Sequence, residues 1–113
     1  NATLFAYGQT GTGKTYTMEG PAEEPGLMSR AITALFAALP DSKQVHYQYA
    51  QLYDSEWLDL LEPTGAAKLS IAEGAAFTYL KGSKLATAAT AAALLADVRA
   101  GGEFRAHGKT NMN

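Results

Sequence analysis

Four residues near the start of the chain, Gly8, Gly13, Lys14 and Thr15, have the types and spacing of a phosphate-binding loop. They occupy every fixed position of the pattern GxxxxGK[ST], in which glycines let the backbone curl so that successive N–H groups point at phosphate oxygens. Lys14 would bring a positive charge to the β- and γ-phosphates of a nucleotide, and the hydroxyl of Thr15 is a ligand for Mg²⁺. We therefore expect this segment to bind a nucleotide together with Mg²⁺.

Such a loop has to be positioned by a strand before it and a helix after it. Residues 2–7 form a short, mostly apolar run that is typical of a buried parallel strand, and residues 14–18 contain no helix breaker. A helix starting at about Gly13 would add the positive end of its dipole to the same anion. Because both conditions are met, a chance match by a glycine-rich turn is disfavoured.

The composition narrows the class of protein. The chain has 113 residues, of which 47% are hydrophobic and 18% charged, as in one globular domain or part of one. A net charge of −2 argues against a nucleic-acid surface, which would be clearly basic. The chain has no cysteine, so it has no disulfide framework and no thiolate metal site. No apolar run approaches the ~18 residues of a membrane span and no signal peptide is visible, which is compatible with the cytoplasm.

Two segments follow the loop helix. Residues 19–26 contain two prolines, two glycines and three glutamates, so we expect an exposed loop whose acids are solvated rather than a metal site. Residues 27–39 are expected to form a helix packed on a sheet and ended by Pro40. Its apolar residues recur at helical spacing: Met28, Ile32, Leu35, Phe36 and Leu39.

The second half of the chain alternates strand and helix patterns. Residues 43–54 are rich in β-formers and predict one strand, and residues 55–63 predict a short helical or extended turn. Two short strands are expected around a loop at 72–76. Residues 86–102 predict a helix that Thr87 or Thr90 caps and Gly101 or Gly102 ends, followed by an irregular polar tail at 103–113. This order is an α/β pattern with too few strands to complete a sheet covered on both faces.

Three other residues with possible chemistry are interpreted as structural or exposed. His46 is alone in a strand, and His107 lies in the polar tail. Asp54 ends a strand, as the acid that supports Mg²⁺ does in phosphate-loop enzymes, but that strand is too polar for the role.

At this point the sequence resembles the motor domain of a kinesin. The loop with its flanks is "FAYGQTGTGKTYTMEG", and the kinesin form is similar: Gln-Thr-Gly, a small residue, Gly-Lys-Thr, then x-Thr-Met. A myosin loop typically carries Glu-Ser in place of Gln9 and Thr10, and small GTPases lack the Tyr-Thr-Met continuation. Further similar segments follow in family order over essentially the whole chain: "GLMSRAI", "QLYDSEWLDLLEP", "LSIAEG" with "YLKG", and "LLADVRAGGEFRAHGKTNMN".

Four positions depart from the family pattern. Ser29 replaces the usual proline, and Gln51, Asp54 and Ser55 replace the usual acid, asparagine and acid. None of them belongs to the phosphate loop, so nucleotide binding is still expected. The departures suggest a divergent subfamily.

The resemblance implies an α/β fragment of the phosphate-loop NTPase fold, with a central, mostly parallel or mixed sheet flanked by helices. Residues 1–113 would be a partial kinesin motor domain, truncated at both ends. It implies ATP or ADP with Mg²⁺ as cofactors, Lys14 and Thr15 as catalytic residues, and Thr15 as the Mg²⁺ ligand. The cofactor-binding residues that it implies are Gly8, Gln9, Thr10, Gly11, Thr12, Gly13, Lys14, Thr15 and Tyr16, with Tyr16 near the adenine or ribose.

For the parent protein the resemblance implies an ATPase stimulated by microtubules, located in the cytoplasm on the microtubule cytoskeleton. Its partners would be microtubules, with no nucleic acid and no membrane. Because the two switch motifs of the family are not in these residues, the isolated 113-residue chain is expected to be inactive. Two alternatives stay open: a nucleotide-binding interaction module derived from a kinesin, without motor activity, and a non-motor phosphate-loop NTPase.

Overall fold

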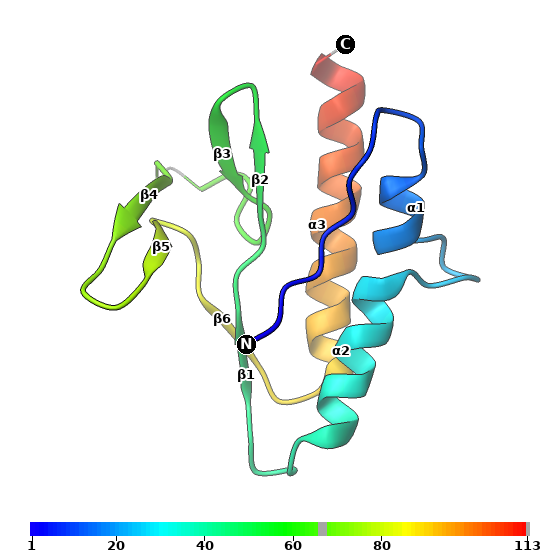
Figure 1. Cartoon of the computed structure of the whole chain (residues 1–113), viewed down its shortest axis with the longest axis vertical. Coiled ribbons are helices and arrows are strands. Elements are labelled where there is room, and N and C mark those ends of the chain that lie inside the picture. The colour runs from blue at the N-terminus through cyan, green and yellow to red at the C-terminus, as the bar shows by residue number, and fades with distance from the viewer. Residues whose placement is uncertain (66–67, 113) are drawn as a thin grey trace. The chain divides into compact units, whose positions relative to one another are not determined.

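The computed structural model describes residues 1–65 and 68–112, with side chains as far as residue 105. The chain forms two compact units, Asn1–Asp41 and Ser42–Asn113, which are considered separately below. Figure 1 traces the helices and strands of both.

The first eight residues are extended chain without secondary structure, so the strand predicted over residues 2–7 is not formed. Phe5 and Tyr7 are 79% and 95% exposed. A strand exists only where its N–H and C=O groups pair with a neighbour, and none of the described residues supplies that neighbour. The apolar character of the segment was correctly identified, and the shortage of strands that the sequence indicated accounts for the absence of a pairing partner among the described residues.

The two helices of the first unit form where the sequence predicts them, but none of the residues of α2 is buried, so the expected packing of this helix on a sheet is not confirmed. α1 spans Lys14–Met18 and α2 spans Leu27–Ala38. α2 ends because Leu39 precedes a proline, which disfavours the helical conformation for the residue before it. Leu39 accordingly has an extended backbone, with ψ at 144°.

The six strands of the second unit pair in three antiparallel ladders of two strands each (Figure 1). The pairs are β1 (Val45–Tyr47) with β6 (Ala86–Ala88), β2 (Ala50–Tyr53) with β3 (Glu56–Asp59), and β4 (Ser70–Glu73) with β5 (Thr78–Lys81). The β4–β5 pair confirms the two strands expected on either side of the loop at 72–76. The chain is α/β as predicted, although the described residues contain antiparallel ladders in place of the mostly parallel or mixed sheet.

The predicted strand over residues 43–54 is divided into β1 and β2, and the predicted turn that follows it is mostly β3. Asp54 and Ser55 form the two-residue connection between β2 and β3, with φ values of 50° and 66°. Two successive positive φ values are the geometry of a type I′ hairpin turn, which usually contains glycine. Because neither residue is a glycine, the sequence carried no clear signal for this hairpin.

α3 spans Ala91–Met112, and the hydroxyl of Thr90 caps it by accepting the Ala93 N–H at 3.2 Å. The prediction that the helix ends at Gly101 or Gly102 is wrong, and so is an irregular tail, because the backbone is helical through Met112. Gly101 allows a close approach instead: a Cβ there would lie 2.6 Å from a ring carbon of Tyr49. In the described part of the chain, no helix is long and apolar enough to span a membrane.

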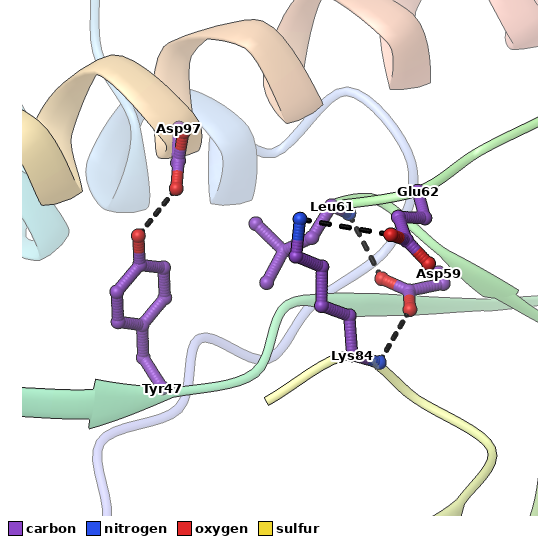
Figure 2. A network of polar contacts seen from close by, with 6 residues as sticks. All are labelled: Tyr47, Asp59, Leu61, Glu62, Lys84 and Asp97. Atoms are coloured by element: carbon purple, nitrogen blue, oxygen red, sulfur yellow. Dashed lines mark hydrogen bonds and ion pairs between the residues drawn. The ribbon is translucent and has the colours of Figure 1, made fainter. Parts of the chain in front are cut away.

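The second unit has a small core that includes one carboxylate. Its buried apolar residues are Leu60, Leu69, Ala88 and Leu94. Asp59, only 5% exposed, accepts the backbone N–H of Leu61 at 2.9 Å and that of Lys84 at 2.7 Å (Figure 2). The carboxylate thereby fastens the end of β3 to the segment that leads into β6, and both of its oxygens have a donor.

A second polar contact joins β1 to α3. The Tyr47 hydroxyl donates to the Asp97 carboxylate (Figure 2). Burial, the hydrogen bond to Asp97 and the negative charge of Asp97 raise the pKa of Tyr47 to about 12. The neutral tyrosine is therefore the form that the folded state favours.

We expect Asp59→Ala to lower the free energy of unfolding by about 2 kcal/mol, because two partly buried N–H donors lose their acceptor. Glu62→Ala is the control: its ion pair with Lys84, at 3.6 Å between half-exposed side chains, should contribute about 0.5 kcal/mol or less. Urea denaturation measures the free energy of unfolding of both variants. Equal losses in the two variants would contradict the structural role of Asp59.

The Tyr47 contact predicts a loss of stability in alkaline solution. A group whose pKa is higher in the folded than in the unfolded state stabilises the fold below its unfolded pKa, about 10 for tyrosine, and loses this effect as the pH rises through its folded value. Denaturation midpoints measured from pH 9 to 12 should therefore fall less steeply for Tyr47→Phe than for the unmodified protein. Tyr53→Phe, a change on a half-exposed ring in β2, should leave the slope unaltered.

Candidate functional site

The phosphate loop begins with a tight turn. The Thr12 N–H and hydroxyl both donate to the carbonyl oxygen of Gln9, at 3.3 and 2.6 Å. The turn brings Gly8 so close to Thr12 that a Cβ on Gly8 would lie 2.7 Å from the Thr12 hydroxyl oxygen. A larger residue at position 8 would therefore displace the hydroxyl that closes the turn.

Gly13 connects this turn to α1. Its φ of 99° lies in the region that residues with a side chain rarely adopt. The carbonyl of Gly13 then accepts the N–H of Thr17 at 2.9 Å, which begins the helix. The second fixed glycine of the sequence pattern is thus required by the backbone itself.

Lys14 is the charged group of the loop and it is half-buried. Its ammonium lies 2.5 Å from the carbonyl oxygen of Gly8 and 2.8 Å from that of Gln9. An ammonium has three donors, and these two contacts fold the side chain back over its own loop. The positive charge is therefore held against the backbone of its own loop, where phosphate oxygens could replace the carbonyls.

Thr15 and Tyr16 follow directly in α1. The carbonyl of Thr15 accepts the N–H groups of Glu19 at 2.8 Å and Gly20 at 3.3 Å, which fixes the end of this short helix. Tyr16 is 56% exposed and its hydroxyl donates to the Glu24 carboxylate. That hydrogen bond, with a smaller effect of desolvation, raises the pKa of Tyr16 above its ordinary value.

These groups suit a polyphosphate. All the residues predicted to contact a nucleotide, 8–16, lie in one continuous segment of the first unit. α1 has only five residues, so its dipole is small and the Lys14 ammonium and the loop N–H groups would carry most of the attraction. Within the described residues no group of three or more His, Cys, Asp or Glu side chains could hold a metal ion. The Thr15 hydroxyl, phosphate oxygens and water are groups that would suit a Mg²⁺ there.

Glu24 was not identified from the sequence. The acids of residues 19–26 were interpreted as solvated, yet Glu24 accepts the Tyr16 hydroxyl and its N–H donates to the carbonyl of Pro21 at 3.1 Å. Pro21 is a recognisable turn residue, but nothing in the sequence pairs Glu24 with a residue eight positions earlier.

The second unit contains a separate hollow of about 540 Å³. It is lined by the β2–β3 hairpin and by α3, through Gln51, Tyr53, Asp54, Glu56, Trp57, Leu58, Phe104 and Arg105. Trp57 is half-buried on its wall. The hollow includes none of the predicted nucleotide contacts.

Comparison with known proteins identifies the family. The family model described as the kinesin motor domain matches residues 1–113. A kinesin-like protein of Arabidopsis thaliana, KIN-7D, mitochondrial, is 36% identical over 117 aligned residues, which cover 100% of this chain and 11% of that protein. The human kinesin-like protein KIFC2 is 42% identical over 73 residues, covering 63% of this chain and 9% of that protein. The chain thus spans about a tenth of the length of these relatives.

Solved structures agree. The structure of a fast kinesin superposes with a TM-score of 0.85 at 31% identity, covering 100% of this chain and 34% of that one. A KIF14 dimer in complex with a microtubule superposes with a TM-score of 0.74 at 28% identity, over 90% of this chain and 31% of that one. The resemblance in the phosphate loop therefore extends to the whole backbone path, and the chain belongs to the kinesin motor domain family.

Proposed function

We propose that this chain is the ATP-binding segment of a kinesin microtubule motor, and that the whole protein hydrolyses Mg-ATP to act on microtubules. The observation that carries the proposal is the Lys14 ammonium, which the curled loop holds against the carbonyls of Gly8 and Gln9. A lysine in that place provides the charge that a triphosphate needs. The family membership supports the choice of ATP and microtubules over other phosphate-loop substrates.

In this proposal the backbone from Thr10 to Thr15 cradles the phosphates. Lys14 exchanges its loop carbonyls for β- and γ-phosphate oxygens and remains beside them as negative charge shifts during transfer. The Thr15 hydroxyl would hold Mg²⁺, which would supply positive charge to the phosphates. Phosphoryl transfer depends mostly on positioning and charge stabilisation, so a segment without a general base can still contribute to it.

The partner and location are inferred from the relatives. The KIF14 structure contains a microtubule and, by its description, AMP-PNP, and the fast-kinesin structure is described in terms of ATPase mechanism and interactions with microtubules. We infer the same partner for the protein that carries this chain, and hence a place on the microtubule cytoskeleton. The residues described here would contribute nucleotide binding to that activity.

We expect Lys14→Ala to weaken Mg-ATP binding by about 100-fold and to abolish microtubule-stimulated ATPase activity, because several charge-assisted contacts are lost together. The measurements are equilibrium binding of ATP and phosphate release with and without microtubules, made on the motor protein that contains this chain. Lys43→Ala, which removes an exposed lysine from the other unit, is the matched control.

Each result has a clear meaning. Undiminished turnover in Lys14→Ala would contradict the proposed site. Binding of ATP that depends on Lys14 without any ATPase activity in the unmodified protein would favour the nucleotide-binding interaction module instead. ATPase activity that microtubules do not change would favour a non-motor NTPase.

A further inference from the structure

The loop between the two helices of the first unit is closed on itself. The Gly26 N–H donates to the carbonyl of Glu19 at 2.9 Å, which joins the two ends of the loop. Gly26 is buried against α1, and a Cβ there would lie 2.5 Å from the Met18 carbonyl. The backbone therefore returns to α1 immediately after leaving it. Residues 19–26 are called the strap below.

The strap is braced from within and from α2. Glu24 and Pro21 close a turn through the hydrogen bond described above, and the Arg30 side chain donates from Nε to the carbonyl of Pro25 at 2.9 Å. Gly20, with φ at 67°, passes so close that a Cβ would lie 2.3 Å from the Glu24 carbonyl oxygen. The backbone that carries the Glu24 carboxylate is thus held at both sides.

The Glu24 carboxylate meets the far end of the Tyr16 ring. Tyr16 follows the phosphate-loop residue Thr15, and it is anchored at its backbone by α1 and at its hydroxyl by Glu24. More than half of the side chain nevertheless remains exposed. An aromatic face that is fixed in orientation and open to solvent is a surface on which a nucleobase can stack.

We propose that Glu24 is a positioning residue for nucleotide binding, which acts by holding the Tyr16 ring in the orientation that contacts the purine. The inference rests on the proposed function, because it requires a nucleotide whose phosphates lie in the loop at residues 8–15. It goes further because it assigns a role to the strap. It also divides the affinity for the nucleotide into a contribution from the phosphates and a contribution from the base. Lys14 and the loop bind the phosphates, whereas Glu24, through Tyr16, contributes only to the base.

Physical chemistry favours this arrangement over a free tyrosine. A free side chain would have to lose its rotational freedom when the base binds. A side chain that a hydrogen bond already holds in one orientation loses little of that freedom. A tyrosine hydroxyl is protonated at neutral pH, and the hydrogen bond to Glu24 together with desolvation raises the pKa of Tyr16 further, so it stays a donor to the carboxylate. A glutamine at position 24 would keep an acceptor oxygen at the same reach, whereas an alanine would not.

The test compares Mg-ATP with inorganic tripolyphosphate, which has the phosphates but no base, in equilibrium binding to the motor protein that contains this chain. Glu24→Ala and Tyr16→Phe should each weaken ATP binding about fivefold and leave tripolyphosphate unchanged, since one charge-assisted hydrogen bond is lost. The double variant should be no weaker than either single one, because both remove the same contact. Glu24→Gln should retain most of the affinity, and Glu23→Ala, which removes the adjacent exposed carboxylate, should bind as the unmodified protein does.

The results separate this inference from the proposed function. If Glu24→Ala binds ATP normally, or if it weakens ATP and tripolyphosphate equally, Glu24 does not act through the base and the inference is wrong. Additive losses in the double variant would also overturn it. If the unmodified protein binds neither ligand, the proposed function fails first and the inference with it.

Discussion

The first unit depends on the contact between the Lys14 ammonium and the carbonyl oxygens of Gly8 and Gln9. This contact holds a positive charge against the backbone of the loop. A phosphate would then bind by replacing two carbonyls at an ammonium that is already in place, so little chain has to be ordered on binding. The same contact explains why a lysine is suitable here, because a single ammonium can redirect its three donors from one set of oxygens to another.

α1 could not maintain this geometry alone, since an isolated helix of five residues is far below the length that is stable in water. Instead, the backbone conformation before α1 and the backbone packing after it hold the two ends of this helix in place. Gly13 turns the chain into the helix with a positive φ, and Gly26 packs against Met18 where the strap returns. The residues that would touch a nucleotide are consequently held by glycines before and after them, and the strap belongs to the site even though its sequence looks like a solvated loop.

The sequence predicted the structural elements that are determined by residues within them or next to them. The apolar spacing and Pro40 determine α2, the Thr90 hydroxyl caps α3, and the glycine and lysine positions mark the phosphate loop. The prediction from the sequence failed where an element depends on contacts with residues elsewhere in the chain. Gly101 resembles a helix stop, but it allows α3 to pass Tyr49 and the helix continues. The pairing of Tyr16 with Glu24, and the burial of Asp59 under two N–H groups, depend on contacts that no short motif encodes.

The departures from the kinesin pattern lie outside the phosphate loop and outside the strap. Ser29 is in α2, Gln51 is in β2, and Asp54 with Ser55 forms the turn between β2 and β3. Asparagine and aspartate both tolerate positive φ, so Asp54 in place of asparagine preserves the turn at φ 50°. Ser55 at φ 66° is less favourable, and the four-residue ladder between β2 and β3 must hold it there. The four departures thus lie outside the loop at residues 8–15, which keeps the kinesin form and whose geometry depends on particular glycines and one lysine.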